Sequence, residues 1–291
     1  MTTYAAFALT DSKDHAHNLG LALENIEPEP SGVGVFELED GSGLWEISGY
    51  FEDKPDEVTL ALLAAAYDAQ SFTVSEVPQT DWVAKVRRSL SPVQAGRFFV
   101  YGSHDQDKVP QDDTTIALLI EASMAFGTGH HFTTQGCLHA LEHLITDGRH
   151  FDNIADIGCG TAVLAMAAAM AWPCTALASD IDPVAIDVAR ANISANSLDQ
   201  QVTCHVAPGF DHDHITKKAP FDLVFANILM SPLIDLASDM RKYTAPNAYL
   251  ILSGILNTQV AQVCSAYGDQ GFILHDQLDI AEWSTLTLRR D

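Results

Sequence analysis

A short glycine-rich segment from Asp156 to Thr161, with the sequence Asp-Ile-Gly-Cys-Gly-Thr, is the part of the chain that most clearly offers chemistry. It lies between an apolar run typical of a strand and a run of small apolar residues typical of a helix. Glycines such as Gly158 and Gly160 let a turn bend sharply and approach a ligand closely. Dinucleotide-binding turns carry a third glycine where this chain has the branched Val163. Asp156 would repel a pyrophosphate but hold an ammonium group, so we interpret the turn as a site for the methyl donor S-adenosylmethionine, in preference to a dinucleotide or an ordinary tight turn.

A second acid follows twenty residues beyond Gly160, where the next apolar run ends at Asp180. A carboxylate at the end of a strand accepts hydrogen bonds from both hydroxyls of a ribose. The helix expected to start at Pro183 needs an N-cap, and Asp182 suits that position better. We therefore expect Asp180 to bind the ribose of the cofactor and Asp182 to cap the helix.

Asn227 ends the fourth strand expected in this part of the chain and is followed by Ile-Leu-Met. Amino-methyltransferases that act on bases or amides often carry Asn-Pro-Pro-aromatic at this place, with the asparagine accepting the N–H of the target. Here Met230 stands where an aromatic residue would stack on a flipped base, which favours an aliphatic amine as the target. A simple turn residue at the strand end is the alternative reading of Asn227.

A second glycine-rich loop, residues 125–134, opens a helix and contains Thr128, His130 and His131. Such a loop could close over a bound cofactor. It is followed by His-Ala-Leu-Glu-His at residues 139–143, which matches an inverted zincin pattern. No third ligand is placed by the sequence, and His212 and His214 lie in an acidic loop expected to face solvent, so no metal site is predicted.

The charge balance of the chain limits the kinds of molecule that it is expected to bind. The chain has 39 acids and 15 bases, a net charge of -24, and lacks the basic footprint of a duplex-binding protein, so no direct nucleic-acid binding is expected. Residues 1–75 contain 14 of the acids and only two bases, which would attract a basic partner or simply keep the surface soluble. No apolar run reaches the ~18 to 20 residues that span a bilayer, and five scattered cysteines suggest no disulfide framework, so we expect a cytoplasmic protein without a membrane association.

The pattern of elements predicts two domains. Residues 1–75 read as strand, helix, two strands, helix and strand, the order of a ferredoxin-like domain. Residues 76–95 interrupt the pattern with two prolines and are predicted to be a linker. Residues 96–291 alternate strands and helices, including one helix over 231–243, which predicts a doubly wound α/β domain with a Rossmann-like parallel sheet. The runs 272–280 and 282–290 lie too close together for a crossover helix, so they should form a terminal antiparallel hairpin.

Four segments together resemble the ribosomal protein L11 methyltransferase family, whose members modify a protein of the large ribosomal subunit. They are MAFGTGHHFTT, DIGCGTAVLAMAA, SDIDPVAIDVARANISAN and VFANILMSPL, and the likeness extends through DWVAKVRRSLSPVQAGRFFV to nearly the whole chain. The first and last of these segments are specific, because they are not general features of methyltransferases. The small N-terminal domain also resembles the substrate-recognition domain of the family.

The resemblance implies N-methylation of lysine side chains and of the N-terminal α-amine of a basic large-subunit ribosomal protein. It implies that the cofactor is bound by Thr128, Asp156, Gly158, Gly160, Asp180 and Asn227, with Thr128 and Asn227 also lining the amine site. Two departures stand out: Phe132 occupies a position where a proline or acid is expected, and residues 207–209 replace an acid that often reads the adenine amino group. A glutamine-amide or nucleic-acid amino-methyltransferase, a dinucleotide oxidoreductase and a noncatalytic binding module remain as alternatives.

Overall fold

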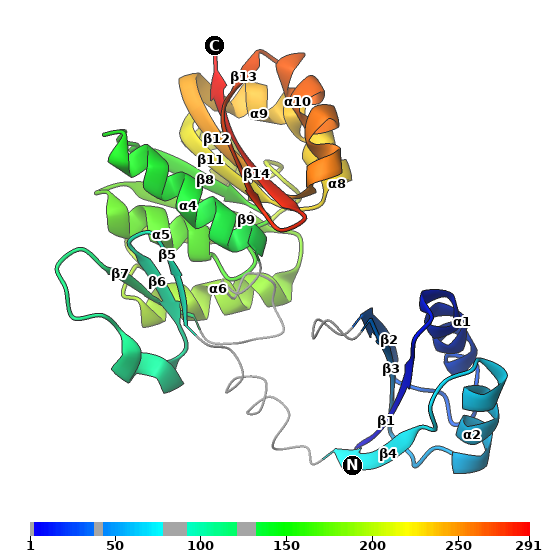
Figure 1. The fold of residues 1–291 in the computed structure, drawn as a ribbon. Coiled ribbons are helices and arrows are strands. Elements are labelled where there is room, and N and C mark those ends of the chain that lie inside the picture. Colours follow the sequence, from blue (N-terminus) through cyan, green and yellow to red (C-terminus); the bar gives the residue numbers. More distant parts are fainter. Residues whose placement is uncertain (1–2, 38–42, 78–91, 121–131) are drawn as a thin grey trace. The chain divides into compact units, whose positions relative to one another are not determined.

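The computed structural model describes residues 3–37, 43–77, 92–120 and 132–291 (Figure 1). Contacts between Cα atoms divide the chain into two compact units, Met1–Val86 and Arg87–Asp291. Each unit has its own hydrophobic core, and each is described by itself.

The N-terminal unit confirms the ferredoxin-like prediction. Its elements are β1 (Thr3–Thr10), α1 (Lys13–Leu23), β2 (Gly32–Glu37), β3 (Trp45–Phe51), α2 (Glu57–Ala66) and β4 (Thr73–Val77). The sheet order is β2-β3-β1-β4, and every pair is antiparallel. Ser12 and Asp56 begin the two helices because their side chains accept hydrogen bonds from backbone N–H groups of the first turn. Both helices pack on one face of the sheet, where Leu19, Ile47 and Leu60 are among the buried residues.

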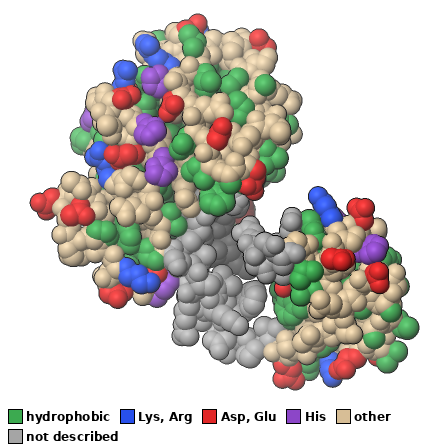
Figure 2. Space-filling view, in the orientation of Figure 1, with side chains coloured by type: hydrophobic (Ala, Val, Ile, Leu, Met, Phe, Trp, Pro, Cys, Tyr) green, Lys and Arg blue, Asp and Glu red, His purple; other side chains and the backbone are tan. Residues whose placement is uncertain are grey.

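Acidic side chains dominate the surface of this unit. Red side chains outnumber blue ones on the face that Figure 2 shows, as expected from 14 acids and two bases in residues 1–75. The basic residue Lys54 is itself paired with Glu57, at 2.7 Å between Nζ and Oε1. The unit therefore presents a largely uncompensated negative charge.

The C-terminal unit confirms the doubly wound α/β prediction. Its main sheet has the order β10-β9-β8-β11-β12-β14-β13, in which β14 pairs antiparallel with both of its neighbours and all other pairs are parallel. The strands are β8 (Asn153–Ile157), β9 (Thr175–Asp180), β10 (Val202–Val206), β11 (Phe221–Asn227), β12 (Thr244–Leu256), β13 (Phe272–Ile280) and β14 (Trp283–Arg290). The predicted terminal hairpin is thus present, and its second strand lies between β12 and β13.

Helices cover both faces of this sheet. They are α4 (Phe132–Thr146), α5 (Val163–Ala171), α6 (Pro183–Ala195), α7 (Asp213–Lys218), α8 (Met230–Asp235), α9 (Ala237–Tyr243) and α10 (Val260–Gly268), with η2 (Asn257–Gln259) before α10. Helices α4, α5 and α6 share one core cluster with the sheet, and α8, α9 and α10 share the other. None of the helices in the described ranges has the length and apolar character needed to cross a membrane.

Two local features differ from the sequence prediction. The sequence predicted a single helix over 231–243, but the structure has two helices, α8 and α9, which meet at Leu236. Cδ2 of Leu236 lies 2.7 Å from the position that a Cβ on Gly209 would occupy. The other is a small sheet of β5 (Val93–Ala95), β6 (Phe98–Tyr101) and β7 (Ile116–Leu119), with η1 (Ser103–Lys108) between the last two. Its first strand occupies the end of the predicted linker 76–95, and β4 occupies its beginning.

The small sheet is tied to α4 by an ion pair. Arg97 Nε donates to Glu142 Oε2 at 2.7 Å, and Arg97 Nη2 donates to Glu142 Oε1 at 3.1 Å. This pair lowers the pKa of the Glu142 carboxyl, since the charged form accepts from the guanidinium. Glu142 is the glutamate of the zincin-like pattern, so its side chain has a structural partner in this fold. His143 of the same pattern pairs through Nδ1 with Asp276, at 3.1 Å.

Candidate active site

A cavity of about 750 Å³ opens at the edge of the main sheet where β8, β9 and β11 end. This is the edge at which ligands of open α/β sheets bind, because loops and helix N-termini diverge there. The turn after β8, Asp180 after β9 and Asn227 after β11 all line the cavity. The structure thus brings together the predicted site residues Asp156, Gly158, Gly160, Asp180 and Asn227.

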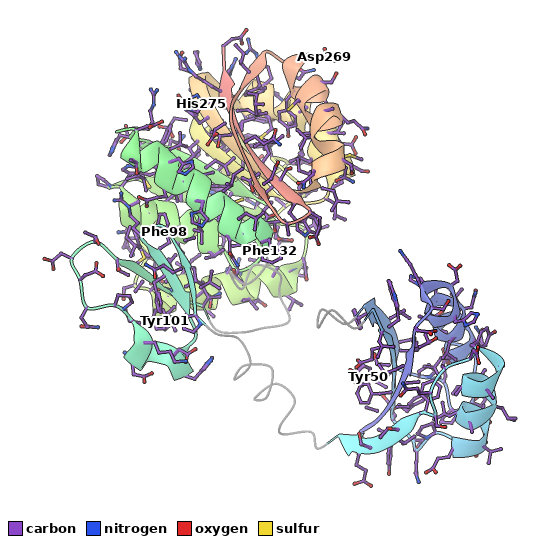
Figure 3. All side chains as sticks on the ribbon, viewed as in Figure 1. Tyr50, Phe98, Tyr101, Phe132, Asp269 and His275 are labelled. Atoms are coloured by element: carbon purple, nitrogen blue, oxygen red, sulfur yellow. The ribbon has the colours of Figure 1, made fainter. Side chains whose placement is uncertain are left out.

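The remaining predicted residue, Thr128, lies outside the described residues, as do His130 and His131. Phe132, the departure from the family pattern, begins α4 and is 42% exposed (Figure 3). The two residues that follow it, Thr133 and Thr134, are buried and line the cavity.

The turn after β8 requires glycine for two reasons. Gly158 has φ +74° and Gly160 has φ +52°, a region that side chains disfavour. A Cβ on Gly158 would also lie 2.3 Å from Cγ2 of Ile228, which packs against the turn from the end of β11. The backbone N–H groups of Gly158 and Cys159 both donate to the carbonyl oxygen of Ser179, at 2.7 and 2.9 Å. The turn is therefore held against β9 and β11 by the protein itself.

Asp156 is the buried carboxyl of the site, with 1% of its surface exposed. Its Oδ2 accepts from the backbone N–H of Ala165 at 3.0 Å, at the first turn of α5. Burial raises the pKa of this carboxyl to about 7, and the negative charge of Asp180 acts in the same direction. A cation bound beside Asp156 would lower that pKa and favour the carboxylate, which is the behaviour expected of a group that holds an ammonium.

Asp180 is oriented by two backbone donors. Its Oδ2 accepts from the N–H of Gly160 at 2.9 Å, and its Oδ1 accepts from the N–H of Asp182 at 3.0 Å. Asp182 in turn accepts from the N–H of Val184 at 2.8 Å and caps α6, as the sequence predicted. Each carboxylate oxygen can accept more than one hydrogen bond, so Asp180 retains acceptor capacity towards the cavity.

Asn227 presents an unsatisfied acceptor. Its Nδ2 donates to Oγ1 of Thr134 at 3.3 Å, whereas its Oδ1 is buried and has no hydrogen-bond partner among the described residues. A buried polar atom without a partner costs about 1–3 kcal/mol, so such atoms concentrate where a ligand completes them. The amide oxygen of Asn227 is therefore positioned to accept an N–H from a molecule in the cavity.

The lining of this cavity also includes residues that the sequence did not predict as site residues, among them Thr134, Asp235 and Trp283. Thr134 was quoted only as part of a loop motif, and its partnership with Asn227 joins positions 93 residues apart, which no local pattern reveals. Asp235 of α8 lines the cavity. Residues Ala207–Gly209, which follow β10 and contain no acid, line it as well. Trp283 is the first residue of β14 and also lines the cavity.

These residues fit S-adenosylmethionine. Asp156 offers a carboxyl for the ammonium of the methionine part, Asp180 offers acceptors for ribose hydroxyls, and Ile181 with Pro208 offers apolar surface for a flat base. A parallel sheet that ends in an antiparallel hairpin, with this cavity at the ends of β8, β9 and β11, defines a class I methyltransferase.

Comparison with known proteins identifies the family. The family model for ribosomal protein L11 methyltransferase (PrmA) matches residues 13–291. A ribosomal protein L11 methyltransferase of Brucella melitensis is 38% identical over 283 residues, which cover 97% of this chain and 98% of the relative. Another from Agrobacterium fabrum is 39% identical over 277 residues, 94% of each protein. The chain belongs to the ribosomal protein L11 methyltransferase family and is an S-adenosylmethionine-dependent protein methyltransferase.

A solved structure agrees with the fold. The crystal structure of a ribosomal protein L11 methylase from Lactobacillus delbrueckii subsp. bulgaricus superposes with a TM-score of 0.61 at 22% identity. The match covers 69% of this chain and 99% of that one. At this level of identity the comparison supports the architecture alone.

Proposed function

We propose that this enzyme methylates lysine side chains and the N-terminal α-amine of ribosomal protein L11. Family membership supports the substrate, since the relatives that match nearly the whole chain are named for that reaction. The single structural observation that carries the chemistry is the buried Oδ1 of Asn227, which has no partner among the described residues. An amine nitrogen that donates to this oxygen would be held at the end of β11, beside the cavity assigned to the donor.

The reaction needs a neutral amine. S-adenosylmethionine supplies an electrophilic methyl group on a sulfonium sulfur. A lysine amine has an ordinary pKa of ~10.4, so the site must favour the neutral form, which desolvation does. Asn227 accepts one N–H, and this orients the nitrogen lone pair away from the amide and towards the methyl group. Orientation of this kind accounts for much of the rate when no strong general base is present.

The remaining roles follow from position in the cavity. We assign the methionine end of the donor to Asp156, Gly158 and Gly160, and the ribose to Asp180. Thr134 orients Asn227, because its hydroxyl accepts from the amide Nδ2 and leaves the oxygen facing the cavity. We keep Thr128 as a further contact of donor and amine on the sequence motif alone.

The domain roles are part of the same proposal. Residues 1–75 would recognise the substrate, and residues 96–291 would carry out transfer. The 14 acids and two bases of the first segment suit a basic ribosomal protein as partner. The substrate of such an enzyme is a protein, and neither a nucleic acid nor a membrane is required, so we place the reaction in the cytoplasm.

Mass spectrometry of purified L11 tests the proposal. Incubation with the enzyme and S-adenosylmethionine should add one or more methyl groups to lysine residues and to the N-terminal amine. Peptide fragmentation would identify the methylated positions. The Asn227→Ala enzyme, which should still bind the donor, is the matched control. Methyl groups found on glutamine amides, or only on ribosomal RNA in a parallel incubation with ribosomes, would contradict the assignment.

A further inference from the structure

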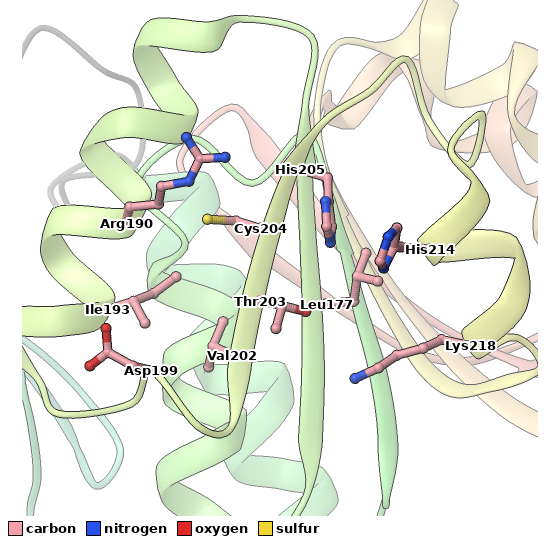
Figure 4. A pocket seen from close by; sticks show the side chains of 10 residues that line it. All are labelled: Leu177, Arg190, Ile193, Asp199, Val202, Thr203, Cys204, His205, His214 and Lys218. Carbon is pink, nitrogen blue, oxygen red and sulfur yellow. The ribbon is translucent and has the colours of Figure 1, made fainter.

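A second cavity, of about 440 Å³, lies on the β10 edge of the main sheet (Figure 4). No residue that lines it also lines the candidate active site. Leu177 from β9, Ile193 from α6 and Val202 from β10 give it apolar surface. The cavity is thus a separate feature of the C-terminal unit, formed where α6 and α7 flank an edge strand.

The walls of this cavity are basic, in a chain that is otherwise strongly acidic. Arg190 of α6, His205 of β10, and His214 and Lys218 of α7 line it, and Asp199 is the one acid among its lining residues. The whole chain has 39 acids and 15 bases, so a surface chosen at random would show the opposite balance. The composition of these walls is therefore suited to an anion.

Three imidazoles gather at one end of the cavity. The ring centroids of His205 and His212 are 4.5 Å apart, those of His205 and His214 are 5.0 Å apart, and those of His212 and His214 are 5.5 Å apart. His212 is fixed by its Nδ1, which accepts from the backbone N–H of His214 at 3.2 Å. Figure 4 shows the His205 and His214 rings next to each other, with the Lys218 side chain extending from the same side as His214.

The local field at His205 is positive. Partial burial lowers the pKa of this imidazole, and His212, His214, Arg190 and Lys218 lower it further. The same charges that oppose a proton at His205 attract an anion placed beside it. A bound anion would offset them and raise the pKa of the ring.

Neighbouring acids neutralise only part of this charge. Arg190 pairs with Asp187 at 3.1 Å, and Lys217 pairs with Asp213 at 3.5 Å. Lys218, the next residue after Lys217, has no ion pair within the described residues. Because β10 is the edge strand, its outer backbone N–H groups face no neighbouring strand and are further donors near the cavity.

We propose that this cavity binds the phosphate group of an organic phosphate, with Lys218, His205 and His214 as donors and the apolar residues against the organic part. Phosphate suits the site because it accepts many charge-assisted hydrogen bonds from lysine and imidazolium groups. A bound phosphate should raise the pKa of His205, which partial burial and the basic neighbours lower in the free protein. Asp199 lines the cavity, and Asp187 and Asp213 pair with basic residues beside it, so these three acids oppose binding of an anion.

Nuclear magnetic resonance of the histidine rings tests the proposal on the full chain. Inorganic phosphate, adenosine monophosphate and a short adenosine oligoribonucleotide would be titrated separately while the imidazole signals are followed. The His205 and His214 signals should shift with all three, and the pKa of His205 should rise. Tighter binding of the mononucleotide assigns the site to small phosphates, and tighter binding of the oligonucleotide assigns it to RNA.

Two neighbouring lysines provide a matched pair of variants. Lys218→Gln should weaken phosphate binding by about fivefold or more, because a direct charged donor is lost. Lys217→Gln should leave it within about twofold, because that ammonium is paired with Asp213 and does not line the cavity. Unshifted imidazole signals, or equal weakening by the two variants, would overturn the proposal. Methylation of L11 is measured independently of these titrations, so neither result depends on the proposed function.

Discussion

The two units of this enzyme differ in whether their acidic and amide groups are exposed or buried. In the N-terminal unit the acids whose side chains the structure describes lie on the surface, and the core cluster is formed by apolar residues such as Leu19 and Phe51. In the C-terminal unit the acid Asp156 and the amide oxygen of Asn227 are buried at the ends of strands, although burial of either is unfavourable. The difference teaches that the reactive geometry belongs to the C-terminal unit, while the N-terminal unit acts through its surface charge.

Loss of the N-terminal unit should have the largest effect. Removal of residues 1–75 should lower kcat/KM on intact L11 by ~1,000-fold, because contacts far from the amine position the substrate. Donor affinity, measured by calorimetry, should change by less than about twofold. Circular dichroism would verify that the truncated enzyme is folded. If the truncated and full-length enzymes were equally active on L11, the division of roles would be wrong.

Removal of the amide at Asn227 should have the next largest effect. Asn227→Ala should lower kcat by ~100-fold, because the amine loses its acceptor and its orientation, while donor affinity stays nearly unchanged. Thr134→Val should give a smaller loss of ~5-fold, since only the bond that orients the amide is removed. Thr134→Ser, which keeps the hydroxyl, should restore activity. Equal losses for the valine and serine variants would refute the orienting role of Thr134.

Asp180→Ala should act on binding instead of turnover. The loss of charge-assisted bonds should weaken donor affinity by ~5- to 150-fold, or about 1–3 kcal/mol, measured by calorimetry. Asp182→Ala is the matched control, because it removes the cap of α6 and costs about 1 kcal/mol of stability without touching the ribose site. A similar loss of donor affinity in both variants would mean that Asp180 supports the fold and does not bind the ribose.

The smallest expected effect is a pH dependence of donor binding. The pKa of Asp156 is raised to about 7, and a bound ammonium favours its ionised form. Affinity should therefore be constant above that pH and fall by at most ~10-fold for each pH unit below it, because the proton must first be released. Asp156→Asn should bind more weakly and without this dependence. Calorimetry at pH 6, 7 and 8 would decide, and a wild-type affinity independent of pH would argue against contact with the ammonium.

Much of the fold could be predicted because its signals are local. Apolar runs, turn residues and caps such as Asp182 marked the strands and helices, and the short spacing after residue 280 marked the hairpin. The small sheet could not be predicted in this way, since β5 has three residues and β7 joins β6 from 15 or more positions away.

The candidate site divides along the same line. Gly158, Gly160, Asp156 and Asp180 belong to two strand-to-helix turns, and each turn is short enough to read as a motif. Thr134, Asp235 and Trp283 reach the cavity from three other elements. Their chemistry gives no local signal, because a threonine in a helix, an acid on a surface helix and a tryptophan in a hairpin are ordinary in those places.

The position of β14 bears on when the enzyme can first work during its own synthesis. Residues 283–290 form an inner strand between β12 and β13, and Trp283 at its start lines the donor cavity. Domains begin to fold as the chain leaves the ribosome, N-terminus first. Neither the sheet nor the cavity can be completed until this strand has emerged from the exit tunnel. A nascent chain stalled before residue 283 would therefore carry the glycine-rich turn, Asp180 and Asn227 and still lack a finished pocket.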